Sequence, residues 1–231
     1  EDGLVEYVNN TNENKKPLSP VIHFEDIDSE TEISCEIALQ YCYEDYNETI
    51  FSYVNNVRTR DGGTHEAGFR AGITRAINDF ADSNKLLRGK KLEGSDIREG
   101  LTAVIALKVP EAYLQFEGQT KGKLGTSEAT PVVQNLMYNK ITYYLTENKE
   151  VALTIIKKCI DAQMARIAAR KAKDEARSKK KTKQEIILSD KLTPAQSKDY
   201  AKNELFIVEG DSAGGSAKKG RDRIHQAILP L

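Results

Sequence analysis

The sequence predicts an α/β (α+β) fold, in which strands near the N-terminus are followed by amphipathic helices. Three observations lead to this prediction. Residues 21–57 are rich in β-branched and aromatic side chains, the hydrophobic period becomes helical after residue 63, and residues 101–110 form a further apolar run. A chain that contains both kinds of segment belongs to the mixed class.

The composition is that of a soluble globular protein with a charged surface. Of the 231 residues, 39% are hydrophobic and 30% are charged, and no stretch reads as a transmembrane span. The length suits one full domain together with parts of others. The net charge of -1 argues against a surface that binds nucleic acid uniformly, but acidic residues gather in 21–50 and basic residues in 166–183. We expect these two regions to face different partners.

The cysteines and the N-terminal residues bear on the compartment. Cys35, Cys42 and Cys159 form no CxxC pair and no cluster with histidine, so neither a disulfide framework nor a zinc site is predicted. A reducing cytoplasm fits this pattern best. Residues 1–20 lack the features of a signal peptide and an initiating Met, so we expect a piece of a longer chain.

Strands are expected first along the chain, because three segments after Pro20 combine strand-forming residues with partial alternation. They are "VIHFEDI" at 21–27, "EISCEIALQYCY" at 32–43 and "TIFSYVNNV" at 49–57. We expect an antiparallel sheet at this end. The later run "LTAVIALKVP" at 101–110 is apolar enough to be a strand buried on both faces.

Helices are expected where the hydrophobic period lengthens. Gly62 and Gly63 supply a turn, and Thr64 is a suitable N-cap for a helix after them. The apolar face of that helix consists of Phe69, Ile73, Ile77 and Phe80. Two later stripes are Val133, Met137, Ile141 and Tyr144, and then Leu153, Ile156, Ile160, Met164 and Ile167. The segment "LQFEGQTKGKLGTSE" at 114–128 reads as a long, mobile loop.

The C-terminal part holds a break and then a new element. Residues 173–203 lack a long apolar period and contain a lysine run and Pro194, which indicates a linker. The buried strand expected at "LFIV", 205–208, then delivers Glu209 and Asp211 to an edge where open α/β sheets bind ligands. Two carboxylates there suit Mg²⁺ or proton transfer, and the alternative is that they cap the following helix.

Basic side chains near this edge are candidates for phosphate contacts. Four of them follow the carboxylates: Lys218, Lys219, Arg221 and Arg223. They would suit a phosphodiester, and the alternative is a solvated helix face. Arg166 and Arg170 belong to a basic segment that could follow a DNA backbone or form a charged helix between domains. The glycine-rich loop does not have the Walker A spacing of an NTP-binding loop.

The loop at 114–128 offers another candidate. Lys121, next to Gln119 and Thr120, stands among glycines, where an ammonium could reach a phosphate as a movable charge. The alternative is that this lysine is merely exposed. His23, His65 and His225 are isolated in the sequence, so we expect structural or solvent roles for all three.

Taken together, these stretches resemble the ATPase subunit of bacterial type IIA DNA topoisomerases, which includes the B subunits of DNA gyrase and topoisomerase IV. The matching stretches are "NNVRTRDGGTHEAGF", "LEGSDIREGLTAVIALKVP", "QFEGQTKGKLGTSEA", "ARIAARKAKDEAR" and "NELFIVEGDSAGGSAKKGRDRIHQAILPL". They follow the family's order and cover nearly the whole chain. "VPEAYLQFEGQTK" and "KLTPAQSKDYAKNELF" look more like the topoisomerase IV branch than gyrase, and Asp190 departs from the family, which usually has Gly there.

The resemblance implies four parts: the end of a GHKL ATPase domain at 1–20, a transducer domain at 21–172, a linker at 173–203, and the truncated start of a TOPRIM domain at 204–231. It also implies a transducer similar to the ribosomal protein S5 domain 2-like fold, with a mixed sheet, a left-handed crossover and a long C-terminal helix. Of the TOPRIM domain, it implies the first strand and loop.

The resemblance also implies ATP and Mg²⁺ as cofactors. Lys121 matches the family's lysine at the ATP γ-phosphate, with Gln119 and Thr120 beside it, and Glu209 matches the TOPRIM general acid/base and Mg²⁺ ligand. The expected activity is ATP-dependent passage of one duplex through a double-strand break, for decatenation, relaxation and chromosome segregation. The chain alone is expected to be inactive.

The partners that the resemblance implies are DNA, the A subunit of topoisomerase IV in an A2B2 heterotetramer, and a second copy of the subunit when ATP binds. The location would be the bacterial cytoplasm, in association with the nucleoid, without a membrane contact. The alternatives are a gyrase B subunit that introduces negative supercoils, or a DNA-binding transducer module without catalysis. A nuclease is disfavoured, because Glu209 and Asp211 alone lack further carboxylates.

Overall fold

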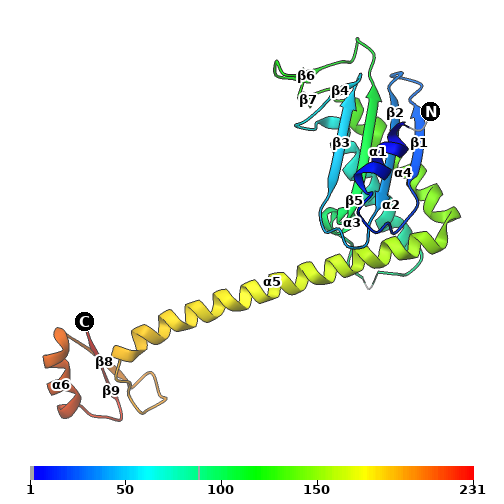
Figure 1. Ribbon diagram of the computed structural model, residues 1–231. Helices are drawn as coiled ribbons and strands as arrows, with labels where there is room; N and C mark the ends of the chain where they lie inside the picture. Colours follow the sequence, from blue (N-terminus) through cyan, green and yellow to red (C-terminus); the bar gives the residue numbers. More distant parts are fainter. Residues whose placement is uncertain (1–2, 88) are drawn as a thin grey trace. The chain divides into compact units, whose positions relative to one another are not determined.

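The computed structural model describes residues 3–87 and 89–231, which form two compact units (Figure 1). The first unit ends at Ile167 and the second is Ala168–Leu231. The first contains α1 (Gly3–Thr11), β1 (Ile22–Ile27), β2 (Ser34–Tyr41), β3 (Thr49–Val54), β4 (Val57–Arg58), α2 (Thr64–Ser83), α3 (Gly94–Arg98), β5 (Leu101–Lys108), β6 (Phe116–Glu117), β7 (Lys123–Leu124) and α4 (Ala129–Glu147). Helix α5 (Lys149–Lys191) begins in the first unit and ends in the second.

The five-stranded sheet of the first unit is mixed, with the order β1-β2-β5-β3-β4. The predicted strands are all present, but the expectation of an antiparallel sheet was only partly right. β1 and β5 are each antiparallel to β2, whereas β3 runs parallel to β5. The reason is that β5, which comes much later in the sequence, lies between β2 and β3. Six of its eight side chains are buried, as its apolar sequence predicts.

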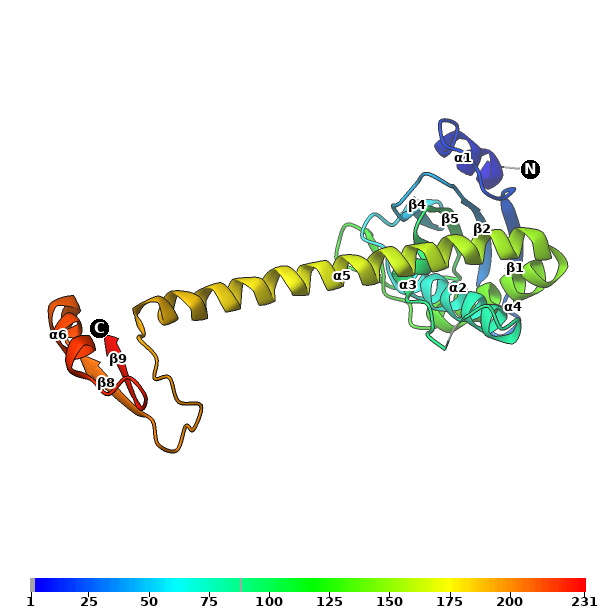
Figure 2. The ribbon, with the colours of Figure 1, turned by 90° about the horizontal axis from the view of Figure 1, so that it is seen from below.

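Helices α2 and α4 pack on one face of this sheet, and α1 packs on the opposite face (Figure 2). Phe69 and Ile73 of α2 and Met137 of α4 join the buried residues of β2 and β5 in one core. A Cβ on Gly68 or Gly72 would lie within 2.6 Å of a backbone oxygen of α4, so these glycines allow the two helices to approach closely.

The start of α2 differs from the prediction, because Gly63 and not Thr64 is the N-cap. Gly63 makes no side-chain cap, and the Thr64 hydroxyl is buried without a partner among the described atoms. The backbone of Gly63 has φ 141, a conformation that residues with a side chain rarely adopt. The helix therefore begins where glycine allows this backbone conformation, and not at a hydroxyl cap.

The buried face of α5 in the first unit also differs from the predicted stripe. Leu153, Met164 and Ile167 are 49%, 63% and 43% exposed, although Ile156 is buried and Ile160 is partly buried as expected. The buried residues are instead Ala152, Ile155, Ile156, Cys159 and Ala162. The face of α5 that holds Ile155, Ile156 and Cys159 therefore packs on the core, and Leu153, Met164 and Ile167 lie to a large part in solvent.

The second unit contains the end of α5, β8 (Glu204–Val208), α6 (Gly210–Gly220) and β9 (Gln226–Pro230). β8 and β9 pair in parallel, with α6 between them in the sequence. The predicted strand at "LFIV" is present as β8, but the prediction that it is buried was wrong, because Leu205 and Ile207 are 56% and 59% exposed. The neighbours of β8 include β9, which pairs with it, and α6.

Helix α5 continues through much of the segment expected as a linker, since it ends at Lys191. The side chains of residues 178–190, which include part of the predicted basic run, lie outside the described residues. Within the part of the chain that the structure describes, no helix has the length and apolar character needed to cross a membrane.

Candidate functional site

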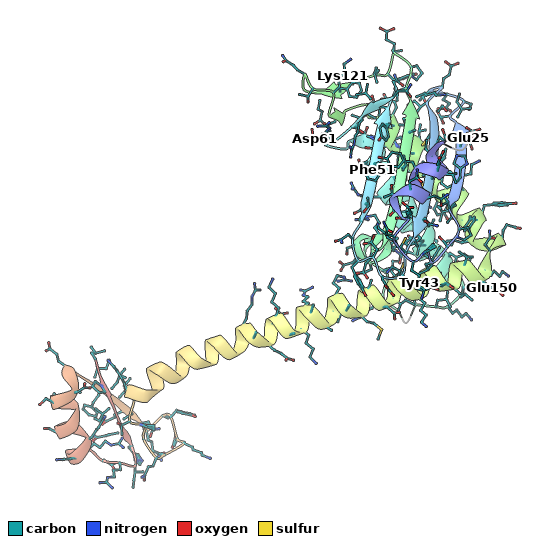
Figure 3. The ribbon with its side chains drawn as sticks, viewed as in Figure 1. Glu25, Tyr43, Phe51, Asp61, Lys121 and Glu150 are labelled. Atoms are coloured by element: carbon teal, nitrogen blue, oxygen red, sulfur yellow. The ribbon has the colours of Figure 1, made fainter. Side chains whose placement is uncertain are left out.

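Lys121 lies in a short hairpin, where a long mobile loop was expected. β6 and β7 pair in antiparallel fashion, with Phe116 opposite Leu124 and Glu117 opposite Lys123, and an ion pair of 2.7 Å joins the last two side chains. Lys121 is exposed near the end of this hairpin (Figure 3). Its φ of 52 lies in the left-handed region, which costs a residue other than glycine about 1 kcal/mol. Neighbouring contacts must therefore hold this conformation.

These contacts come from the turn at 59–63, before α2. The Asp61 amide donates to the Gly122 carbonyl at 2.9 Å, and the Leu124 amide donates to the Gly62 carbonyl at 3.0 Å. A Cβ on Gly63 would collide with the Leu124 carbonyl oxygen, so only glycine allows the turn to lie this close to the hairpin. Backbone hydrogen bonds therefore hold the turn and the hairpin of Lys121 together.

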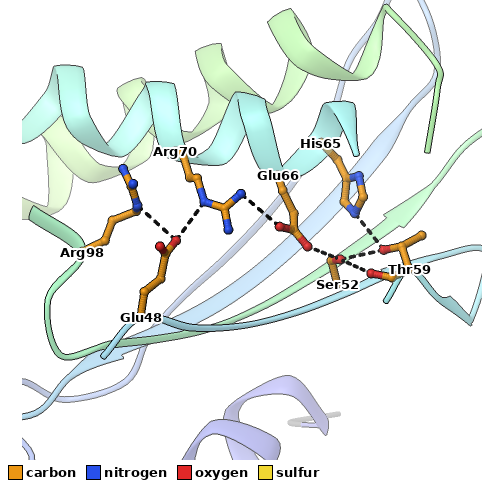
Figure 4. Close-up of polar contacts among 7 residues, drawn as sticks. All are labelled: Glu48, Ser52, Thr59, His65, Glu66, Arg70 and Arg98. Carbon is orange, nitrogen blue, oxygen red and sulfur yellow. Dashed lines mark hydrogen bonds and ion pairs between the residues drawn. The ribbon is translucent and has the colours of Figure 1, made fainter. Parts of the chain in front are cut away.

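Four buried polar side chains stand behind this turn (Figure 4). The Ser52 hydroxyl donates to Glu66 Oε1 at 2.6 Å and lies 2.6 Å from the Thr59 hydroxyl, which lies 3.1 Å from His65 Nε2. With the Ser52 hydroxyl as hydrogen-bond donor to the Glu66 carboxylate, the Thr59 hydroxyl donates to the Ser52 oxygen. His65 Nε2 then donates to the Thr59 oxygen. We call this set the Ser52–Glu66 network, and its donors all point toward Glu66.

The histidine of this network is neutral because of its burial. His65 is fully buried, and burial lowers its pKa from 6.5 to about 4. Its Nδ1 atom is buried without a partner among the described residues, as expected for the unprotonated nitrogen of the neutral ring. The structural role expected for this histidine agrees with its position.

The network continues along the surface as ion pairs. Arg70 contacts Glu66 Oε2 at 3.2 Å and Glu48 Oε1 at 2.9 Å, and Arg98 also contacts Glu48 Oε1 at 3.0 Å (Figure 4). None of these residues was a candidate from the sequence. One signal was present, because Glu66 precedes Phe69 and Ile73 at helical spacing and so falls on the apolar face of α2.

Glu209 is the N-cap of α6, at the end of β8 in the second unit. Its carboxylate makes no cap hydrogen bond, and both Glu209 and Asp211 are exposed. Among the described residues, no group of three or more His, Cys, Asp or Glu side chains lies close enough to hold a metal ion. Mg²⁺ is commonly held by one or two carboxylates together with waters and substrate phosphates, so Glu209 and Asp211 have the right chemistry but would not surround the metal by themselves.

Two of the predicted DNA contacts are used inside the protein instead. Arg166 forms a two-bonded pair with Asp96 at 2.7 and 2.9 Å and a third contact with Glu93 at 2.8 Å. These acids raise the pKa of the Arg166 guanidinium, with the Asp96 hydrogen bond as the largest cause. Arg221 donates to the carbonyls of Thr193 and Pro194 at 3.1 and 2.9 Å. The Arg166 guanidinium is thus paired with two carboxylates, and the Nη1 atom of Arg221 is occupied by backbone carbonyls.

The other basic candidates are exposed. Lys218 and Lys219 lie in the last turn of α6, Arg223 follows it, and Arg170 lies on α5. Gln119 and Thr120 are also exposed, next to Lys121 in the hairpin. Gln119, Thr120 and Lys121 are therefore neighbours in the hairpin of the first unit, whereas in the second unit Glu209 lies at the N-terminus of α6 and Lys218 and Lys219 lie at its opposite end.

A family profile described as DNA gyrase B matches residues 3–175, which is most of the chain. The chain belongs to the DNA gyrase B family. The matched range includes the hairpin of Lys121, the turn at 59–63 and the Ser52–Glu66 network.

Curated relatives within the DNA gyrase B family match the chain over its whole length. The B subunit of DNA topoisomerase 4 from Bacillus subtilis (strain 168) is 54% identical, and the one from Streptococcus pneumoniae is 55% identical. The chain spans only 35% and 36% of the length of these two relatives. It is thus similar to about a third of each.

Solved structures with the same fold are ATPase regions of the DNA gyrase B family. The 43K ATPase domain of Thermus thermophilus gyrase B in complex with an aminocoumarin is 32% identical, with a TM-score of 0.67 over 75% of this chain and 46% of that one. The topoisomerase IV ATP-binding domain of Francisella tularensis, in complex with a small-molecule inhibitor, is 27% identical, with a TM-score of 0.61 over 72% of this chain and 44% of that one.

Proposed function

We propose that this chain is part of an ATP-dependent type II DNA topoisomerase of the topoisomerase IV kind. The whole-length similarity to B subunits of DNA topoisomerase 4 supports this proposal. The observation that carries the mechanism is the position of Lys121, an exposed cation on a hairpin whose backbone is fixed from behind. The reaction is the passage of one duplex through a double-strand break in another, with decatenation and relaxation as its products.

Lys121 is proposed to recognise the γ-phosphate of ATP, with Gln119 and Thr120 as its neighbours on the hairpin. An ammonium at this position attracts a phosphate that carries the terminal negative charge. Hydrolysis and release of that phosphate end the attraction, so the hairpin is freed and can transmit the change to the rest of the first unit.

Glu209 is proposed as the general acid or base of DNA cleavage and as one ligand of Mg²⁺. Its exposed carboxylate at the end of β8 supports this role. Among the described residues no group of three or more His, Cys, Asp or Glu side chains surrounds such a metal, so water and DNA phosphates would have to complete its coordination. Cleavage by the chain alone is therefore not expected.

The proposed partners are DNA, the A subunit of topoisomerase IV in an A2B2 assembly, and a second copy of the subunit on ATP binding. The proposed contacts to the DNA backbone are Lys218, Lys219, Arg223 and Arg170. Arg166 and Arg221 are not among them. The proposed location is the bacterial cytoplasm, at the nucleoid, where chromosome segregation takes place. The S5 domain 2-like transducer at 21–172 and the TOPRIM start at 204–231 remain part of the proposal.

The test of this function uses the full-length subunit that carries the chain, with its cognate A subunit, ATP and Mg²⁺. Relaxed circles and interlinked circles are supplied as substrates. Decatenation without new negative supercoils is expected. Introduced supercoils would instead identify a gyrase, and the absence of ATP-dependent strand passage on both substrates would contradict the proposal.

The substitution Lys121→Ala tests the role of the hairpin in the same protein. It should remove most of the ATP hydrolysis, because the charge that recognises the γ-phosphate is lost. Lys149→Ala is the matched control, since Lys149 is an exposed lysine at the start of α5. Wild-type turnover of ATP by the Lys121→Ala protein would exclude the proposed coupling role.

A second candidate, a DNA-binding module without catalysis, is favoured by the exposed basic side chains of the second unit. Salt-dependent binding of DNA by the 231-residue chain, without ATPase or cleavage activity, would support it. Both functions can hold at different chain lengths.

A further inference from the structure

The hairpin of Lys121 depends on the turn at 59–63, and that turn depends on Glu66. The Glu66 carboxylate lies directly against Gly62, since a Cβ on Gly62 would be 2.9 Å from Glu66 Oε2. The carbonyl of the same Gly62 accepts the Leu124 amide of the hairpin at 3.0 Å. The Glu66 carboxylate therefore contacts the turn, and the turn is hydrogen-bonded to the hairpin.

Glu66 also fixes the beginning of the turn through Ser52. The Ser52 hydroxyl joins Glu66 Oε1 to the Thr59 hydroxyl, with 2.6 Å on each side. The Thr59 amide donates to the Ser52 carbonyl at 2.9 Å, so β3 holds both the backbone and the side chain of Thr59. Glu66 thus restrains the turn at Thr59 and at Gly62.

A buried carboxylate at this position is expected to lower the stability of the fold relative to an apolar side chain of the same size. Taking a charge out of water costs several kcal/mol, and an apolar side chain of similar size is often as good or better for stability. A carboxylate with fixed donors instead specifies one geometry, because its hydrogen bonds are directional. Ser52 on Oε1 and Arg70 on Oε2 leave the carboxylate one orientation here.

We propose that Glu66 is a positioning residue for Lys121. Glu66 holds the turn at 59–63 in the conformation that presents the hairpin, and with it Lys121, to the nucleotide. The proposal rests on the role of Lys121 given above, and it assigns Glu66 no contact with the nucleotide. Loss of the carboxylate frees the turn, and Lys121 then samples several positions in place of one.

The first test is amide hydrogen exchange in the 231-residue chain, which needs no nucleotide and no activity. In Glu66→Ala, the amides of Asp61 and Leu124, which join the turn to the hairpin, should exchange roughly tenfold faster than in the wild type. Amides of β2 and β5 should keep their wild-type rates. Ser52→Ala removes the hydrogen bonds of this hydroxyl to Glu66 Oε1 and to the Thr59 hydroxyl, and it should accelerate the same two amides while Glu66 keeps its contact with Arg70.

Glu66→Gln and Asp79→Ala are the matched variants. Gln keeps an oxygen that accepts from Ser52, so this variant should restore most of the protection. Asp79 lies on the same helix in an exposed pair with Arg75, at 3.6 Å, and its loss should leave both amides unchanged. Wild-type exchange at Asp61 and Leu124 in both Glu66→Ala and Ser52→Ala would overturn the proposal.

The second test measures ATP and ADP in the full-length subunit. In Glu66→Ala, the KM for ATP should rise roughly tenfold while the affinity for ADP stays near the wild type, because only the contact to the γ-phosphate is lost. Equal weakening of both nucleotides would show a merely structural role and overturn the proposal. If exchange at the two amides accelerates but Lys121→Ala hydrolyses ATP normally, the positioning of the hairpin stands and the proposed function of Lys121 fails.

Discussion

At the scale of single residues, the unusual feature is a group of buried polar side chains on a helix face that is otherwise apolar. His65 and Glu66 are buried at the start of α2, next to Phe69. Burial favours the neutral form of His65, so its protonation works against the folded state. The stability of the first unit therefore depends on pH through this residue.

The sign of this dependence follows from the two pKa values of His65, 6.5 unfolded and about 4 folded. Between these values the unfolded chain binds more protons, so stability is fully present above pH 6.5 and falls as the pH approaches 4. From pH 7 to pH 5 the loss due to His65 should be about 2 kcal/mol. Urea unfolding of the wild type and of His65→Gln at several pH values measures it. Identical pH profiles for the two proteins would contradict the prediction.

The sequence singled out Lys121 as a candidate but did not predict its surroundings. An exposed cation among glycines can be recognised from local residue types alone. Its left-handed backbone and the support from Gly62 and Gly63 depend on a turn that is distant in the sequence. Glu66 was missed for the same reason, because its partner Ser52 lies on another element.

At the scale of elements, the long periodic segments were predicted correctly and the short or ambiguous ones were not. β2, β5, α2 and α4 follow their hydrophobic periods, because each buries a continuous face. The hairpin of β6 and β7 has two residues in each strand, too few for a period, and was read as a loop.

The error in α5 has a different cause. Leu153, Met164 and Ile167 have helical spacing, and so do Ala152, Ile155 and Cys159 beside them. The first set is the more hydrophobic, but the second set is the one that is buried against the core. Spacing alone does not tell which of two neighbouring stripes the core selects.

One contact of α5 leads to a prediction at this scale. The carboxylate of Asp96 in α3 is 2% exposed and is neutralised by Arg166 of α5. Arg166→Ala leaves this charge buried without its cation, so it should lower the midpoint of urea unfolding clearly. Arg170→Ala, one turn further along the helix, is the control and should leave the midpoint within error. An unchanged midpoint for Arg166→Ala would show that Asp96 finds other compensation.

At the scale of the whole molecule, charge is distributed by region and not spread evenly. The net charge is only -1, yet acidic residues gather in 21–50 and basic ones in 166–183. A long-range attraction to DNA therefore cannot come from the net charge and must come from local groups. Lys218 and Lys219, exposed at the end of α6, are such groups in the second unit.

The salt dependence of DNA binding by the chain tests this local contribution. If Lys218 and Lys219 each neutralise one phosphate, replacing both by Ala should make the plot of log affinity against log salt less steep by about 1.8. The matched control is the double variant Lys198→Ala and Lys202→Ala, which removes the same charge from an exposed segment of the same unit. Equal slopes for the two double variants would exclude a specific role of α6.

The mixed topology of the sheet has a consequence for the order in which the protein folds. Strand β5 links the antiparallel half to the β3–β4 pair, with Thr49 opposite Thr102 and Tyr41 opposite Leu101. These pairs are far apart in sequence, so the contact order of the sheet is high and its closure is slow. During synthesis, β2 and β3 must wait with open edges until the ribosome has released the chain through Lys108.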